Sequence, residues 1–274
     1  MPVTSFNGKV AAITGAGSGM GQWLAILLSR AGCHVAISDV NQATLDETMK
    51  LLDSSVNATS HVVDVADRGA MEAFAAEVNE KHRGINMIFN NAGVSVTGLA
   101  EQMPYEDIEW LMNINFWGVI HGCKSFLPYL READEAAVIN TSSIFGTIAV
   151  PSQSAYNASK FAVKGYTFAL RTELADSHIG VSCVQPGGVK TNIVASSRFI
   201  PIDNESETKE ELTEMFERMA GKSAEEAAQI ILDGVLRNKA RILVGKDARV
   251  IAWVEKWFPT GYLRLMQALR NRRQ

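Results

Sequence analysis

Short apolar runs alternate with longer amphipathic segments along most of the chain. The short runs are continuously apolar, which is typical of parallel strands that are buried on both faces. Seven such runs predict strands: KVAAIT, HVAIS, SHVVDV, INMIFN, AAVINT, IGVSCV and ARILV. Helical periodicity occupies the intervening segments near 19–31, 42–53, 67–82, 105–130, 154–177 and 223–238. This order predicts an α/β fold with one doubly wound parallel sheet of about seven strands and helices on both faces.

Two segments depart from the alternation. Residues 191–220 follow a predicted strand and are long for a connection in an α/β fold, so we expect a substrate lid there. Thr208 and Glu211 have the spacing of a capping box and predict a short helix within the lid. The C-terminal extension, 246–274, is apolar, aromatic and basic, and Pro259 divides it into two short helices. We interpret residues 1–274 as a single domain.

The composition is that of an ordinary globular protein, with 47% hydrophobic and 20% charged residues. A net charge of -4 argues against a nucleic-acid binder, which is usually basic. We see no secretory leader and no apolar run of membrane-spanning length, and the three cysteines lie far apart. The five histidines lack ligand-like spacing, so we expect no metal. These features favour a cytoplasmic protein.

A glycine-rich turn joins the first predicted strand to the next helix. Gly15, Gly19 and Gly21 follow the pattern G-x-x-x-G-x-G. Glycine permits such a tight turn and the close approach of a pyrophosphate, whose charge the helix N-terminus attracts. Asp39 ends the second predicted strand, where an acid would accept the ribose hydroxyls of adenosine. Because a carboxylate repels a 2′-phosphate, we expect NAD rather than NADP, although Asp39 or Asn41 could also cap the following helix.

These features and later motifs together resemble the short-chain dehydrogenase/reductase family, classical type, over residues 8 to about 191. The motifs are TGAGSGMG (14–21), VVDVAD, NNAG (90–93), NINFWG, INTSS (139–143), YNASK (156–160) and PGGVKT (186–191). The resemblance implies a Rossmann-like, dinucleotide-binding catalytic domain. The cofactor-binding residues that it implies are Gly15, Ser18, Gly19, Met20, Gly21, Asp39, Asp64, Val65, Asn91, Ala92, Gly93, Tyr156, Lys160, Pro186, Gly187, Val189 and Thr191.

The same resemblance implies a catalytic group of Asn115, Ser143, Tyr156 and Lys160. Reduction of a ketone leaves developing charge on oxygen, which needs a proton donor, and Tyr156 would supply that proton. An isolated phenol has a pKa of about 10. Lys160 lies one helical turn later, and we expect its ammonium to lower the pKa of the phenol and to bind the nicotinamide ribose.

Two members of this group have a neighbouring alternative. Ser143 would bind the substrate oxygen and has the spacing of the family to the tyrosine, whereas Ser142 is the competitor. Asn115 would kink its helix and hold a water linked to the lysine, and Asn113 is the alternative there. The family pattern favours Ser143 and Asn115.

The expected substrate is a hydrophobic secondary alcohol or its ketone, because the candidate pocket is largely apolar. The candidate pocket residues, beside the lid, are Ser95, Ile144, Phe145, Pro151 and Phe199. The alternatives are an NADPH-type ketoreductase of acyl thioesters and a non-catalytic dinucleotide-binding regulator. We expect a homo-oligomer, with a dimer through the helices at 105–130 and 154–177 favoured over a tetramer. The C-terminal extension is expected to pack on the body or a partner subunit in preference to a membrane surface.

Overall fold

The computed structural model describes residues 2–201, 208–264 and 267. Its main sheet has seven parallel strands in the order β3-β2-β1-β4-β6-β7-β9. Their bounds are β1 Val10–Thr14, β2 His34–Asp39, β3 Ala58–Val62, β4 Met87–Asn90, β6 Ala136–Thr141, β7 Ile179–Pro186 and β9 Arg241–Val244. The predicted doubly wound fold is confirmed. The chain order reverses between β1 and β4, and ligands bind at such a switch point in α/β sheets.

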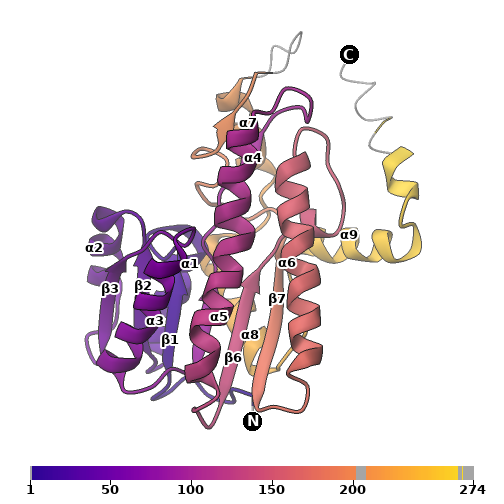
Figure 1. The fold of residues 1–274 in the computed structure, drawn as a ribbon. Helices are drawn as coiled ribbons and strands as arrows, with labels where there is room; N and C mark the ends of the chain where they lie inside the picture. Colours follow the sequence, from indigo (N-terminus) through magenta and orange to yellow (C-terminus); the bar gives the residue numbers. More distant parts are fainter. Residues whose placement is uncertain (1, 202–207, 265–266, 268–274) are drawn as a thin grey trace.

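Helices cover both faces of this sheet, because successive strand residues point to opposite sides. Ile13 packs in the cluster that contains α1 (Gly19–Arg30) and α8 (Ala224–Leu236), with α2 (Gln42–Leu51) beside it. The neighbouring Ala12 packs in the cluster that contains α3 (Arg68–His82), α5 (Gly118–Leu130) and α6 (Ser154–Glu173). Figure 1 shows α5 and α6 side by side in front of the central strands. Continuous apolar runs are therefore buried on both sides.

Three local features differ from the predicted elements. The edge strand β3 ends at Val62, rather than at Val65, since its only partner β2 ends at Asp39, which lies opposite Val62. The predicted helix at 105–130 comprises α4 (Tyr105–Met112), the π-helix η1 (Asn113–Trp117) and α5. A second small sheet, unpredicted, pairs β5 (Val96–Thr97), after β4, with β8 (Arg198–Phe199) in the lid.

The lid and the C-terminal extension also contain helices. The predicted capping box is present, and Thr208 and Glu211 begin α7 (Lys209–Met219). The lid residues 202–207 lie outside the described part. In the extension, α9 (Lys246–Trp257) ends two residues before Pro259, as expected for a residue that cannot continue a helix. No helix in the described ranges combines the length and hydropathy needed to cross a bilayer.

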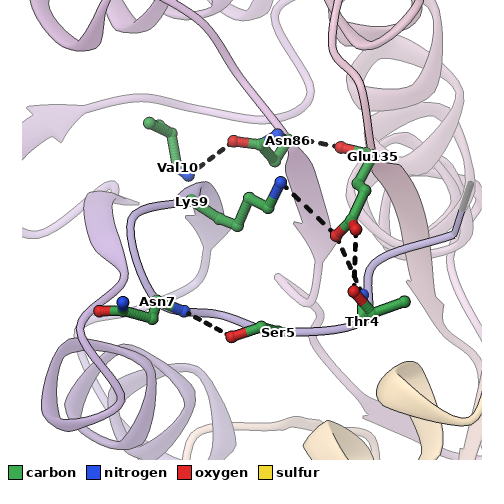
Figure 2. A network of polar contacts seen from close by, with 7 residues as sticks. All are labelled: Thr4, Ser5, Asn7, Lys9, Val10, Asn86 and Glu135. Atoms are coloured by element: carbon green, nitrogen blue, oxygen red, sulfur yellow. Dashed lines mark hydrogen bonds and ion pairs between the residues drawn. The ribbon is translucent and has the colours of Figure 1, made fainter.

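The amino ends of the central strands are joined by a polar network (Figure 2). Asn86 accepts the N–H of Val10 at 2.9 Å and donates to the carbonyl of Glu135 at 2.9 Å, so that it links β1 to β6 across β4. The Glu135 carboxylate accepts the N–H and hydroxyl of Thr4 and pairs with Lys9 at 3.5 Å. This network stabilises the end of the sheet opposite the site described next.

Candidate active site

The glycine-rich turn between β1 and α1 is a tight backbone cradle. Gly15 and Gly19 have φ of +65° and +55°, a region that L side chains rarely adopt. A Cβ on Gly15 would lie 2.7 Å from Cα of Ala92, and one on Gly21 would collide with the Gly15 carbonyl. Ser18 is the N-cap residue of α1, and its side chain makes no capping hydrogen bond. This arrangement fits a pyrophosphate against the N-terminus of α1.

Asp39 lies beside this turn at the end of β2. Its Oδ2 accepts the N–H of Gly17 at 3.1 Å and its Oδ1 accepts the N–H of Asn41 at 3.1 Å. The cap of α2 is Asn41, whose side chain accepts the N–H groups of Ala43 and Thr44. Of the two capping candidates, Asn41 takes that role, and the partly exposed carboxylate of Asp39 is fixed next to the phosphate turn.

The segment after β4 is tied to the phosphate turn through Thr14. The Oγ1 of Thr14 accepts the N–H groups of Asn91 and Ala92 at 3.0 and 3.1 Å, and the Asn91 amide donates back to the Thr14 carbonyl. On the neighbouring loop after β3, Asp64 is exposed and Val65 is buried. Four loops at the carboxyl edge of the sheet thereby carry the predicted cofactor residues between Gly15 and Gly93, at the place expected for a dinucleotide.

Asn115 lies in the π-helix η1, a distortion that is common at functional sites. Its Oδ1 accepts the N–H of Val94 at 2.8 Å, while its Nδ2 donates to the Val94 carbonyl and to Oγ of Ser159. A Cβ on Gly93 would lie 3.2 Å from Asn115 Oδ1 and 3.3 Å from Lys160 Nζ. The absence of a side chain at Gly93 therefore leaves room where the backbone, the amide and the ammonium meet.

The Ser143 side chain lies close enough to the Tyr156 hydroxyl to lower the pKa of the phenol. The Ser143 hydroxyl also accepts the N–H of Phe145 at 3.1 Å, and the Phe145 ring lies edge-on to Tyr156 with centroids 6.3 Å apart. The Ser142 hydroxyl instead donates to the carbonyl of Lys160 at 2.7 Å. This geometry favours Ser143 over Ser142 as the serine that contacts a substrate oxygen.

Lys160 is buried beneath the phenol. Its Nζ donates to the Thr141 carbonyl at 3.1 Å and lies 5.6 Å from the ring centroid of Tyr156. Burial raises the pKa of Tyr156 to about 12 against the effect of Ser143, and burial lowers the pKa of Lys160 to about 8. The lowering of the phenol's pKa that we expected from Lys160 is not seen in the protein alone, because burial dominates the shift. Tyr156 is a neutral proton donor near pH 7.

The loop after β7 faces the phosphate turn. A Cβ on Gly19 would lie 3.2 Å from the Thr191 methyl group, so the two loops approach closely. The N–H of Gly188 donates to the Asp247 carboxylate at 2.7 Å, and that carboxylate occupies the space where Gly187 would carry a Cβ. Helix α9 is thus attached to this loop. Pro186, at the end of β7, and the buried Val189 lie at the same edge of the sheet. Met20, in the first turn of α1, packs against the hydrophobic core.

The predicted pocket residues lie around the same end of the sheet. Ser95 is buried beside β5, and Phe199 is in β8. Phe145 contacts Tyr156, as described above, and Pro151 is exposed in the loop before α6. Ile144 is buried in a cluster with α9. The structure therefore places Ser95 and Phe199 at the lid and Phe145 at the tyrosine, whereas Ile144 and Pro151 lie beside the C-terminal extension.

An apolar cluster beside Tyr156 escaped the sequence reasoning. Its members besides Tyr156 are Val94, Val96, Met103, Ile108, Trp110, Leu111, Met112, Ala155 and Ile200. The guanidinium of Arg198 lies 3.8 Å from the Trp110 ring centroid and pairs with Asp107 at 2.6 Å, which attaches the lid to α4. The apolar periodicity of residues 105–112 could have predicted this apolar cluster. No sequence pattern indicated the pairing of β5 with β8.

The profile of the short chain dehydrogenases matches residues 9–199. The chain belongs to the short-chain dehydrogenase/reductase family. The Mycobacterium tuberculosis protein SadH, described as a candidate oxidoreductase, is 39% identical over 270 residues, which are 97% of this chain and 96% of SadH. The 3-ketodihydrosphingosine reductase of Bacteroides thetaiotaomicron is 33% identical over 199 residues, which are 73% of this chain and 71% of that enzyme.

Solved structures of the family agree with this assignment. A short-chain dehydrogenase/reductase from Burkholderia phymatum in complex with NAD superimposes with a TM-score of 0.84, at 27% identity, over 96% of each chain. The protein is therefore an NAD(P)-dependent dehydrogenase/reductase with a nicotinamide dinucleotide cofactor. The turn that contains Gly15 and Gly19 fits that cofactor, because a glycine-rich turn before a helix N-terminus lets a pyrophosphate approach the backbone N–H groups.

Proposed function

We propose that this enzyme interconverts a hydrophobic secondary alcohol and its ketone, with NAD as the preferred cofactor. The observation that carries the proposal is the apolar cluster around Tyr156. A partly exposed phenol stands between that cluster and the Phe145 ring, so a carbonyl near the phenol would have apolar neighbours. The similarity to a 3-ketodihydrosphingosine reductase supports the same class of substrate.

The catalytic residues have distinct parts in this proposal. The nicotinamide ring supplies or accepts the hydride. Ser143 donates a hydrogen bond to the substrate oxygen, and Tyr156 transfers the proton to that oxygen in reduction or accepts it in oxidation. Lys160, whose Nζ lies 5.6 Å from the ring centroid of Tyr156, binds the ribose and favours the phenolate form during proton transfer. Asn115, through its bonds to Val94 and Ser159, positions the helix that carries these groups.

The preference for NAD rests on Asp39. Its carboxylate is fixed at the end of β2 by two backbone N–H groups, close to the phosphate turn. A 2′-phosphate placed there would meet this negative charge, and no Lys or Arg occurs in residues 15–21 or 40–49 to neutralise it. A free ribose diol would instead donate hydrogen bonds to the carboxylate.

A substrate panel tests the reaction. Purified enzyme is incubated with aliphatic, aromatic and polycyclic secondary alcohols or ketones, with NAD(H) or NADP(H), and NADH fluorescence is followed. We expect turnover that increases with the apolar size of the substrate and is faster with NAD(H). Tyr156→Phe should lose about 10²- to 10⁴-fold in turnover, the usual contribution of a proton-transfer group. Its affinity for NADH should stay within a few-fold of the wild-type value.

The matched control is Tyr166→Phe, which removes the hydroxyl of a partly buried tyrosine. Tyr166 lies on the same helix, α6, but further from the catalytic group. That variant should retain turnover. Wild-type turnover by Tyr156→Phe would show that the catalytic assignment is wrong. Binding of NADH without conversion of any apolar substrate, but with conversion of charged ones, would instead reject the substrate class.

A further inference from the structure

The C-terminal extension differs in charge from the rest of the chain. Residues 246–274 contain seven Lys and Arg but only two acidic residues, a net charge of +5. Because the whole chain has a net charge of -4, residues 1–245 carry -9. An acidic enzyme thus ends in a basic and aromatic segment, and such asymmetry indicates an interaction surface.

Helix α9 presents opposite faces to the protein and to solvent. Its small residues Ala248 and Ala252 are buried in a cluster with Ile144. On the other side, Val250, Trp253 and Trp257 are 60%, 59% and 61% exposed. Their spacing of three and four residues places them on one stripe of the helix. The next residue, Phe258, is 56% exposed and extends this surface. We call these four exposed apolar residues the α9 face.

Basic residues surround the α9 face. Lys246 lies one turn before Val250 on the same stripe, and Arg249 and Lys256 flank it, all three exposed. Lys256 Nζ lies 5.4 Å from the Trp257 ring centroid, so its aliphatic stem follows the aromatic surface. Of the two acidic residues of the segment, Asp247 binds the Gly188 N–H through its carboxylate, and Glu255 is half-buried.

We propose that the α9 face docks the enzyme on the surface of an anionic phospholipid bilayer. Tryptophan and phenylalanine side chains insert at the level of the headgroups, while lysine and arginine reach the lipid phosphates. A second copy of the chain is a poorer occupant, because an interface core is depleted of charge and would bury the Lys246 ammonium within the stripe. At a bilayer, the same ammonium remains among phosphates and water.

Docking in this orientation brings the lipid close to the catalytic end of the molecule. Asp247 attaches the first turn of α9 to the loop after β7, and the Tyr262 hydroxyl accepts the N–H of Ala149 at 3.1 Å in the loop that precedes α6. A cavity of about 500 Å³ lies between that loop and Leu263. On the proposed function, an apolar substrate dissolved in the bilayer would be near this loop, but lipid binding itself does not depend on that function.

Vesicle flotation of the full-length enzyme tests the proposal. Vesicles of equal parts phosphatidylglycerol and phosphatidylcholine are compared with vesicles of phosphatidylcholine alone. We expect at least about tenfold stronger binding to the anionic vesicles, a decrease at high salt, and a blue shift of tryptophan emission. Trp253→Ser/Trp257→Ser and Lys246→Gln/Arg249→Gln/Lys256→Gln should each weaken binding about tenfold or more.

The control variant is Leu51→Ser/Val62→Ser, which removes two side chains that are 52% and 58% exposed at the opposite edge of the sheet. It should bind vesicles as the wild type does. Circular dichroism and NADH titration check that each variant is folded. Equal binding to both vesicle types, no binding, or unchanged binding by the tryptophan variant would overturn the proposal. Loss of an oligomer in the tryptophan variant, without vesicle binding by the wild type, would assign the α9 face to a second copy.

Discussion

The Nζ of Lys160 lies 5.6 Å from the ring centroid of Tyr156, and both groups are shielded from water strongly enough to shift their pKa values in opposite directions. Burial favours the neutral form of each, so the phenol becomes a weaker acid and the ammonium a stronger one. In the protein alone, desolvation therefore determines the direction in which the pKa of each group is shifted.

This relationship predicts a pH dependence of cofactor binding. The pKa of Lys160 is lowered to about 8, so the ammonium is present below pH 8 and is lost as the pH rises. If Lys160 binds the ribose, the affinity for NADH should fall as the pH rises through about 8. Lys160→Met should remove this dependence and weaken binding about 10- to 100-fold, as for a charged hydrogen bond.

The measurement is an NADH fluorescence titration between about pH 6.5 and 9.5. Lys164→Met is the control, since this half-buried lysine lies one turn later on α6. A pH dependence that persists in Lys160→Met, or disappears in Lys164→Met, would assign the titration to another group.

The amide variant Asp39→Asn tests the source of cofactor preference. Asn at this position retains an oxygen that can accept the Gly17 N–H, so the turn should be preserved while the negative charge is removed. We expect the ratio of kcat/KM for NAD(H) to that for NADP(H) to fall about tenfold or more. Asp46→Asn, on the exposed side of α2, is the control and should leave the ratio unchanged. An unchanged ratio in Asp39→Asn would remove Asp39 as the determinant.

Arg198 is expected to control lid position. Its guanidinium stacks on Trp110 and pairs with Asp107, and it is the polar attachment between β8 and α4 that we find in the described ranges. Arg198→Ala should raise KM for an apolar substrate about three- to tenfold with a smaller change in kcat, because the lid loses an anchor outside the catalytic group. Steady-state kinetics of Arg218→Ala provide the comparison, because Arg218 forms an exposed ion pair with Glu214 on α7. Equal effects of the two variants would contradict a specific anchor.

His82, near the edge strand β3, leads us to predict that the protein loses folding stability in acid. Burial, with the nearby charges of His34 and His61, lowers the pKa of His82 to about 4, and its Nε2 lies 2.9 Å from Thr59 Oγ1. In the unfolded chain, His82 binds a proton near pH 6.5. The contribution of its neutral form to folding stability is therefore complete above pH 6.5 and is lost as the pH falls toward 4. The loss should be about 2 kcal/mol after allowance for partial exposure. Urea unfolding across this range should show a smaller loss for His82→Gln, and an equal loss would exclude His82.

The sequence predicted the sheet well because each central strand is buried on both faces and therefore has a continuous apolar run. It also distinguished Asn115, which is buried, from the exposed Asn113. The resemblance implies a kink at Asn115, but the helical periodicity of 105–130 did not reveal the π-helix there, since it is stabilised by contacts with Val94 and Ser159 from other parts of the chain. The pKa of Tyr156 was misjudged for a similar reason, because desolvation depends on tertiary packing that a sequence motif does not specify.

The last prediction concerns the dimer expected through the helices at 105–130 and 154–177, which correspond to α4, η1 and α5 and to α6. On α6, Phe161, Gly165 and Ala169 are exposed and follow one another at four-residue intervals, which forms a flat stripe on the helix. A Cβ on Gly165 would meet nothing within 4 Å, so the monomer gives no packing reason for a glycine that costs helix stability. Trp117, on η1, adds an aromatic side chain that is 49% exposed. A partner helix pressed closely against this stripe would explain both the glycine and the exposed aromatic groups.

Light scattering after size-exclusion chromatography measures the outcome. The wild type should be a dimer, and Phe161→Glu/Gly165→Arg should be a folded monomer, because it places a charge and a long side chain where the partner would pack. Gly165→Ala alone should raise the melting temperature of the protein slightly. It should weaken the dimer less than the double variant does. Trp253→Glu, on the α9 face, should leave the dimer intact. If Trp253→Glu dissociates it and the α6 variant does not, the two copies meet through the C-terminal extension and the α6 stripe has another role.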